Sequence, residues 1–277
     1  MQPWRPDPGL SSPPSGGATR RPGSRLRRWG RGARRGLCLL GLWSACTAWA
    51  EAPVLTLGVV EDSAPMSYRG PAGELLGFNI DVARALCREL ARECEFRPTR
   101  FDTVLEDLRQ AKFEVAAVSL VITPERGRQI LFSRPIYRSM TVWLSAAGRL
   151  PQQPQVRVAV VGGTVQAALA RRRGWHVVEA TTNGGLASLL SSGQADGMLA
   201  PMLTVFSQMK KPELQTLGLS VQPYDDPELR KGAQSAAFGI APGRHELKSV
   251  IDAALERLDR DGELDKISSR YLPFKVN

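Results

Sequence analysis

The residue of this chain best suited to chemistry is an arginine in the first turn of a predicted helix. Thr123 followed by Pro124 is typical of a helix N-cap and a first helical position, and Arg126 follows two residues later. Free backbone N–H groups and the positive end of the helix dipole lie at such a start. A guanidinium there can bind a carboxylate through two parallel hydrogen bonds. The pattern predicts an anion site at Arg126; the alternative is a structural arginine paired with an acid such as Glu125.

A second candidate is the turn Gly162-Gly163-Thr164. A glycine pair followed by a capping threonine directs backbone N–H groups and a hydroxyl toward an anion. Many strand-to-helix turns share this composition, so the motif gains its weight from its position in the chain.

The residue types and spacings give little support for catalysis or metal binding. The chain has two histidines, His176 and His245, and neither stands at the spacing of a catalytic base or metal ligand. No Ser/His/Asp or Cys/His order is present. We therefore expect no catalytic residue, no metal and no cofactor. The run Arg171–Arg173 is predicted at a helix end, where cations complement the dipole.

The first 50 residues form a basic leader. They contain nine Arg and one Asp, a net charge of +8, so the remainder carries +10 − 8 = +2. The apolar run Gly36–Ala48 and the small-x-small triplet Ala48-Trp49-Ala50 predict a secretory signal cleaved before Glu51. Because most of the excess charge leaves with the leader, the high isoelectric point does not indicate a nucleic-acid partner.

Two cysteines remain after the leader, Cys87 and Cys94. In an exported protein this pair predicts a disulfide between a helix end and the next strand. Two buried free thiols are the alternative.

Strand and helix patterns alternate along the rest of the chain, which predicts an α/β fold. Asn79 and Asp102 are expected to cap two early helices. Expected strands are Val54–Val60, Glu95–Arg97, Val115–Ser119, Met140–Ala146, Arg157–Val161, His176–Glu179, Gly197–Leu199 and Ser235–Ile240. The last of these is expected to return to the first α/β unit.

The segments Ile122–Arg126 and Phe132–Tyr137 resemble the ITPER and FS.PYY motifs of the periplasmic amino-acid-binding proteins of ABC importers, solute-binding family 3. The resemblance runs from Leu55 to Leu272. It implies a two-lobed periplasmic-binding-protein (Venus-flytrap) fold, each lobe a mostly parallel sheet flanked by helices, with two hinge crossings.

The implied division of the chain follows from this resemblance. Residues 1–50 are the signal peptide and basic leader, 51–141 the first part of lobe 1, 142–237 lobe 2, and 238–277 the return to lobe 1.

The resemblance also implies a ligand set. Arg126 holds the ligand carboxylate from lobe 1, and Gly163 with Thr164 donate to it from lobe 2. Phe101 lines the ligand side chain, although a core phenylalanine is an equal alternative, and Ser119 contacts the ligand at a strand end.

The chain departs from the family pattern where the ligand's α-ammonium is bound. Pro201 stands where an Asp normally accepts from that group. Burying an ammonium without a carboxylate costs several kcal/mol. Asp62, with its neighbour Glu61, is the candidate to replace the missing acid. Further altered positions are Val60, Ser63, Met66, Val121 and Val165.

These observations predict a periplasmic solute-binding protein that delivers a small anionic or zwitterionic ligand, an amino acid or organic acid, to an inner-membrane ABC permease. We expect a monomer, no nucleic-acid partner and no enzymatic activity. Two alternatives remain open: a ligand-sensing or regulatory periplasmic module acting on a partner protein, and a dehydratase-like enzyme on the same scaffold.

Overall fold

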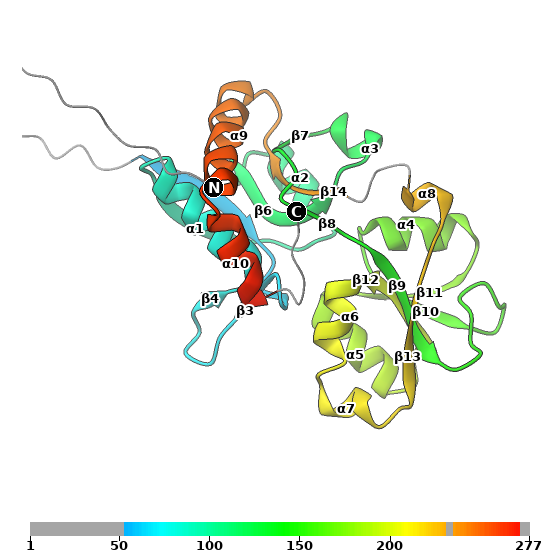
Figure 1. Ribbon diagram of the computed structural model, residues 1–277. Coiled ribbons are helices and arrows are strands. Elements are labelled where there is room, and N and C mark those ends of the chain that lie inside the picture. The colour runs from blue at the N-terminus through cyan, green and yellow to red at the C-terminus, as the bar shows by residue number, and fades with distance from the viewer. Residues whose placement is uncertain (1–52, 231–234, 272–277) are drawn as a thin grey trace, which may run out of the picture. The chain divides into compact units, whose positions relative to one another are not determined.

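The computed structural model describes residues 53–230 and 235–271, and these residues form two α/β lobes (Figure 1). The predicted leader, residues 1–50, lies outside the described residues. Each lobe contains one large mixed sheet with helices on both faces, which confirms the predicted two-lobed α/β fold. A small antiparallel sheet of β2 (Asp62–Ser63), β3 (Ser67–Arg69) and β4 (Leu75–Leu76) lies between β1 and α1 in the chain.

The sheet of lobe 1 has the strand order β5-β1-β6-β14-β7, with β8 also paired to β14. Strand β1 runs parallel to β5 and β6, whereas β14 is antiparallel to β6, β7 and β8. The strands are β1 (Val54–Val59), β5 (Glu93–Pro98), β6 (Val115–Val121), β7 (Leu131–Phe132), β8 (Tyr137–Arg138) and β14 (Ser235–Ile240).

Strand β6 shows why both faces of this sheet are covered. Val115 and Ala117 pack into one core cluster, and the alternate residues Ala116, Val118 and Leu120 pack into another. Because successive side chains of a strand point to opposite faces, a continuous apolar run requires helices on both sides. Helices α1 (Phe78–Glu89), α9 (His245–Arg260) and α10 (Glu263–Tyr271) contribute to the first cluster, and α2 (Val104–Arg109) to the second.

The sheet of lobe 2 has the order β11-β10-β12-β9-β13. Strand β10 is parallel to β11 and β12, and β9 is antiparallel to β12 and β13. The elements are β9 (Thr141–Ala146), β10 (Arg157–Val161), α4 (Val165–Arg172), β11 (His176–Ala180), α5 (Asn183–Ser191), β12 (Gly197–Pro201), α6 (Met202–Gln208), α7 (Pro212–Gln215), β13 (Leu219–Pro223) and α8 (Pro227–Arg230).

The chain passes between the two sheets twice. It enters the second sheet at β9 and returns to the first at β14, in agreement with the expected return of Ser235–Ile240. The residue limits of the lobes stay a prediction.

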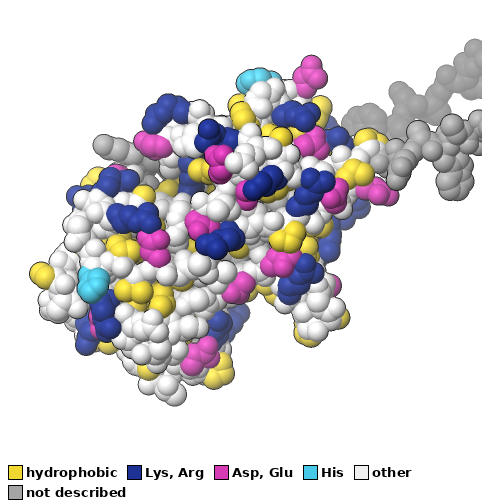
Figure 2. Space-filling model, turned by 180° about the vertical axis from the view of Figure 1, so that it is seen from behind, with side chains coloured by type: hydrophobic (Ala, Val, Ile, Leu, Met, Phe, Trp, Pro, Cys, Tyr) yellow, Lys and Arg dark blue, Asp and Glu magenta, His cyan; other side chains and the backbone are white. Residues whose placement is uncertain are grey.

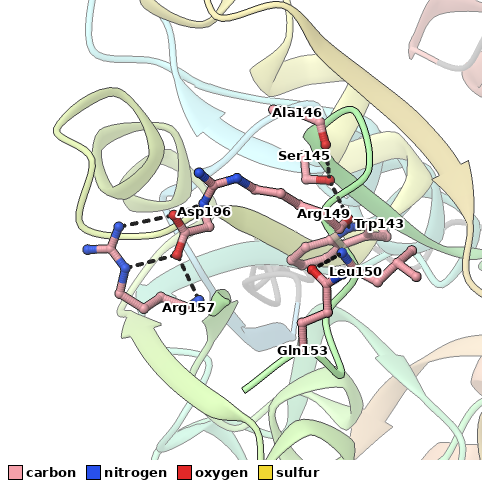
Figure 3. A network of polar contacts seen from close by, with 8 residues as sticks. All are labelled: Trp143, Ser145, Ala146, Arg149, Leu150, Gln153, Arg157 and Asp196. Atoms are coloured by element: carbon pink, nitrogen blue, oxygen red, sulfur yellow. Dashed lines mark hydrogen bonds and ion pairs between the residues drawn. The ribbon is translucent and has the colours of Figure 1, made fainter. Parts of the chain in front are cut away.

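A charged cluster fixes the start of β10 within lobe 2 (Figure 3). Asp196 accepts hydrogen bonds from the Arg157 backbone N–H and Nε, both at 2.9 Å, and it also pairs with Arg149. The Arg157 side-chain hydrogen bond is the main cause that lowers the pKa of Asp196 to about 2. The cluster joins the residue before β12 to the loop after β9 and to the first residue of β10.

Two predicted helix caps are wrong. Helix α1 begins at Phe78 after Gly77, whose φ of 122° is adopted by few residues other than glycine. Asn79 is therefore inside the helix, and it is buried. Helix α2 begins at Val104 after Thr103, and the Asp102 carboxylate instead binds the Arg100 guanidinium at 3.0 and 2.7 Å.

The predicted disulfide is present. Cys87, near the end of α1, is joined to Cys94 in β5. The disulfide joins the helix to the edge strand of the first sheet and closes the short loop between them.

The surface of the described residues carries both charge signs. Figure 2 shows Lys and Arg side chains interspersed with Asp and Glu over the face seen from behind. Within the described part of the chain, no helix is both long enough and apolar enough to cross a membrane.

Candidate functional site between the lobes

The candidate residues lie where strands of the two sheets end. Ser119 is near the end of β6, Gly163 and Thr164 follow β10, and Pro201 ends β12. Ligands of α/β proteins bind outside the carboxyl ends of the strands. The arrangement therefore directs backbone turns of both lobes toward one region.

Arg126 lies in α3 (Pro124–Gly127), and the predicted cap is confirmed: Thr123 Oγ1 accepts a hydrogen bond from the Arg126 N–H at 3.3 Å. The side chain is 7% exposed. Its Nη1 donates to the Val121 carbonyl at 2.8 Å, and its Nη2 reaches the Gly163 carbonyl of the other lobe at 2.9 Å. The guanidinium carbon is 6.0 Å from the centre of the Phe101 ring.

Burial lowers the pKa of Arg126 to about 10. The guanidinium is still charged at neutral pH, and its two acceptors named above are neutral carbonyl groups. A buried cation whose partners carry no full charge is stabilised by an incoming anion.

Gly163 brings the lobes into backbone contact. Its φ is 77°, and a Cβ at this position would lie 2.8 Å from the Cα of Asp102 in lobe 1. The following residue, Thr164, caps α4 by accepting from the Ala167 N–H at 3.1 Å, while its own hydroxyl donates to the Val161 carbonyl. Glycine is required at 163 both by the φ angle and by the approach of the other lobe.

A narrow cavity of about 50 Å³ lies between the lobes. Four of the predicted ligand residues line it: Phe101, Ser119, Thr164 and Pro201. Its other walls are neutral as well, and no charged residue is among the described residues that line it. A space of this size holds roughly three to five waters.

Polar side chains of the narrow cavity are already hydrogen-bonded within the protein. The Ser119 hydroxyl donates to Asn79 Oδ1 at 2.6 Å, and Gln166 Nε2 donates to Thr141 Oγ1 at 2.8 Å. Tyr137 also lines the cavity, and burial raises its pKa to about 12. These groups hold the walls in place and present neutral donors and acceptors.

A second, wide cavity of about 510 Å³ is also lined by residues of both lobes. Arg126 and Gly163 line this cavity, whereas Thr164 and Gln166 line both cavities. Arg126 therefore belongs to the wall of the wide cavity and not to that of the narrow one, and the residues shared by the two walls are Thr164 and Gln166.

Asp62 is not brought together with the other predicted residues, and it lines neither cavity. It lies in β2 (Asp62–Ser63), and its Oδ2 accepts from the Thr182 hydroxyl of lobe 2 at 2.7 Å. Next to it, Ser63 Oγ accepts from Asn183 Nδ2 at 2.8 Å. These bonds connect the lobes beside the narrow cavity.

Several residues at the site were missed by sequence reasoning. Asn79, Tyr137, Gln166 and Asn183 line the narrow cavity, and Arg172 with Glu228 lines the wide one. Gln166 and Asn183 stand in the first turns of helices that follow strands, so their positions carried a signal. Asn79 and Tyr137 lie in apolar surroundings, where nothing distinguishes them from capping or core residues.

The described residues contain no group of three or more His, Cys, Asp or Glu that could hold a metal ion. The arrangement of carbonyls, hydroxyls and one buried guanidinium suits the binding of a small polar or anionic molecule.

The two-lobed α/β fold and the interlobe site are those of periplasmic binding proteins. The family model of bacterial extracellular solute-binding proteins, family 3, matches residues 55–274, and the chain belongs to this family.

Curated relatives of this chain are amino-acid-binding proteins. It is 26% identical over 250 residues to the lysine/arginine/ornithine-binding periplasmic protein of Escherichia coli K12, covering 86% of this chain and 95% of the relative. It is also 26% identical over 255 residues to the histidine-binding periplasmic protein of the same strain, with the same coverage.

Solved structures share the fold. An ancestral arginine-binding protein bound to arginine matches with a TM-score of 0.70 and 22% identity, over 79% of this chain and 98% of the other. The ancestral amino acid-binding protein AncCDT-1, a precursor of cyclohexadienyl dehydratase, matches with a TM-score of 0.70 and 26% identity, over 79% and 95% of the two chains. Family and fold together support a solute-binding role.

Proposed function

We propose that this protein is an extracytoplasmic solute-binding protein that delivers a small carboxylate-bearing ligand, an amino acid or an organic acid, to an inner-membrane ABC importer. In this proposal it is exported to the periplasm by its leader and acts as a monomer without enzymatic activity. Residues 51–141 and 238–277 form lobe 1, and residues 142–237 form lobe 2.

The buried charge of Arg126 carries the proposal. A pKa lowered from 12.5 to about 10 corresponds to roughly 3 kcal/mol of unfavourable burial of the cation at neutral pH. A carboxylate that accepts two hydrogen bonds from the guanidinium offsets this cost directly. In the proposal the ligand replaces the Gly163 carbonyl as the partner of Nη2.

Ligand-dependent closure follows from groups that lie in different lobes. Arg126 belongs to lobe 1, and Gly163 with the start of α4 belongs to lobe 2. An anion bound by both is fully coordinated only when the lobes are together, so binding favours the closed form. The closed form is the one that we propose docks to the permease.

Pro201 decides how an amino acid could be bound in this proposal. It lines the narrow cavity without a charge, and Asp62 lies elsewhere. An α-ammonium in the narrow cavity would be bound by neutral oxygens of serine, threonine, asparagine and glutamine. Organic acids without this group avoid that loss of charge compensation.

A thermal-shift screen of amino acids and organic acids on the mature protein tests the proposed function. A ligand at a hundred times its dissociation constant stabilises a protein by about 2.7 kcal/mol, which is readily measured. We expect carboxylates to stabilise the wild type and to lose this effect in Arg126→Gln.

Arg128→Gln is the matched control, because Arg128 is an exposed arginine two residues away. Its stabilisation by the same ligands should equal that of the wild type. Equal stabilisation of all three proteins would show that the carboxylate is bound without Arg126, and the proposed function would lose its basis.

A further inference from the structure

The two cavities of the candidate site differ tenfold in size, and only the one lined by Arg126 has room for a molecule larger than a few atoms. The narrow cavity measures about 50 Å³ and the wide cavity about 510 Å³. Sites for small molecules typically measure about 300–1,000 Å³. The wide cavity lies within this range, and three of the predicted ligand residues line it: Arg126, Gly163 and Thr164.

Positive charge faces the wide cavity from two directions. The Arg126 side chain, 7% exposed, is part of its wall, and α4 begins at the same wall with Thr164, Val165 and Gln166. The N-terminus of a helix carries a partial positive charge. Arg126 is thus a buried cation, held by carbonyl groups, at the positive end of an eight-residue helix.

The other charged residues of this wall are compensated or exposed. Arg172 Nη2 pairs with Glu228 Oε1 at 2.7 Å, and Glu125 is exposed. The pKa of Glu125 is lowered, mainly by a backbone hydrogen bond and then by the Thr123 side chain. The remaining lining includes the apolar side chains of Val121, Pro124, Val165, Ala168 and Leu229.

We propose that the wide cavity holds the body of the ligand, and that the ligand is a carboxylate with an apolar body. This inference rests on the proposed function, because it uses the same bond between Arg126 and the carboxylate. The carboxylate lies at Arg126 and the first turn of α4, and the apolar part extends between α4 and α8. Between α4 and α8 the lining is apolar apart from the paired Arg172 and Glu228, so an apolar body suits this part of the cavity.

Isothermal titration with four probes tests the chemical class. 3-Phenylpropionate combines a carboxylate with an apolar body, and 3-phenylpropanol replaces the carboxylate with a neutral hydroxyl. Phenylalanine adds an ammonium, and arginine has a cationic body. We expect 3-phenylpropionate to bind at least tenfold more tightly than the alcohol and arginine, and phenylalanine to gain nothing from its ammonium.

Two variants locate the ligand. Ala168 lines the wide cavity but not the narrow one. Thr204, a buried residue of α6, lines the narrow cavity but not the wide one. Ala168→Leu adds volume between α4 and α8 with a residue of high helix propensity. It should weaken 3-phenylpropionate at least tenfold, whereas Thr204→Leu should change its affinity by less than twofold. Circular dichroism checks that both variants fold.

The possible results separate the inference from the proposed function. If Thr204→Leu weakens binding and Ala168→Leu does not, the body lies in the narrow cavity and the inference is wrong, while the role of Arg126 stands. If arginine binds tightest, the apolar class is wrong. If Arg126→Gln leaves every affinity unchanged, the proposed function fails first. Should Ala168→Leu not fold, Val165→Phe fills the same cavity and serves in its place.

Discussion

Two arginines of this protein have opposite surroundings. Arg157, at the start of β10, binds the Asp196 carboxylate through its backbone N–H and its guanidinium, within the cluster of Figure 3. Arg126, in α3, is buried and donates to the carbonyls of Val121 and Gly163. The first cation has a carboxylate within its own lobe, and the second has neutral partners in two different lobes.

The difference separates structural from ligand-binding charge. A carboxylate fixed by three hydrogen bonds from one arginine stabilises the fold and leaves little capacity for another anion. A buried guanidinium held by carbonyls destabilises the empty protein and gains from an added anion. Charge compensation, rather than the residue type, therefore identifies the arginine that is available for a ligand.

The largest effect is expected at Arg126. Arg126→Gln should weaken carboxylate binding about a hundredfold or more, since a bidentate charged contact is lost. Its melting temperature should stay the same or rise, because the variant removes an unfavourable buried charge. Calorimetric titration and thermal melting of the same sample measure both. A clear fall in melting temperature with unchanged affinity would make Arg126 a structural residue like Arg157.

The opposite pattern is expected at Asp196. Asp196→Asn should lower the free energy of unfolding by about 1–3 kcal/mol, because charged hydrogen bonds from Arg157 are weakened. Ligand affinity should stay within twofold. Urea unfolding measures the stability of this variant, and calorimetric titration measures its ligand affinity. A loss of binding free energy larger than the loss of unfolding free energy would show that Asp196 acts on the ligand site and is not only structural.

The contribution of the ionised Asp196 carboxylate to stability should also appear in the pH dependence of unfolding. The pKa of Asp196 is lowered from 3.8 to about 2, so the folded state favours the carboxylate form. The contribution is complete above about pH 4 and is lost as the pH falls toward 2. Acid unfolding of Asp196→Asn should lack this part of the pH dependence; identical acid curves for variant and wild type would show that the cluster contributes nothing.

A smaller effect is expected at Gly163, across the interface from Arg126. Gly163→Ala places a Cβ 2.8 Å from the Cα of Asp102, at a φ of 77°. Closure is then hindered, and affinity should fall about tenfold, or about 1.4 kcal/mol. Gly148→Ala is the matched control, because Gly148 has a φ of 76° and open space around its Cβ position. Gly148→Ala should introduce the same backbone strain and bind the ligand as tightly as the wild type.

The smallest effect is expected at Asp62. Its bond to the Thr182 hydroxyl lies at the surface and adds to closure without contacting either cavity. Asp62→Ala should weaken ligand binding about two- to fivefold, since an exposed hydrogen bond contributes roughly 0.5–1 kcal/mol. A hundredfold loss by titration would instead return Asp62 to the ligand set.

Much of the fold was predictable because many of its features depend only on residues that are close together in the sequence. The Thr123 and Thr164 caps, the buried run of β6 and the Cys87–Cys94 pair all follow from neighbours in the chain. Asn79 failed as a cap because Gly77 permits an entry to α1 that composition does not reveal. The short elements β13, α7 and α8 carry weak periodicity, and they form by packing against β9, α5 and α4, respectively.

The candidate site was predictable in its residues and less so in its geometry. Arg126, Gly163 and Thr164 come together, and Phe101, Ser119 and Pro201 line one cavity. That the site contains two cavities of unequal size depends on how closely the lobes approach. No periodicity or motif reports a distance between segments far apart in the chain.

The close approach of residues 101–102 to Gly163 offers an optical readout. Asp102 is exposed on one side of this contact, and the opposing glycine has no side chain to shield it. A solvatochromic dye attached at position 102 would move from bulk water to the backbone surface around Gly163 when the two lobes close. Its emission would follow occupancy in real time, without any label on the bound molecule.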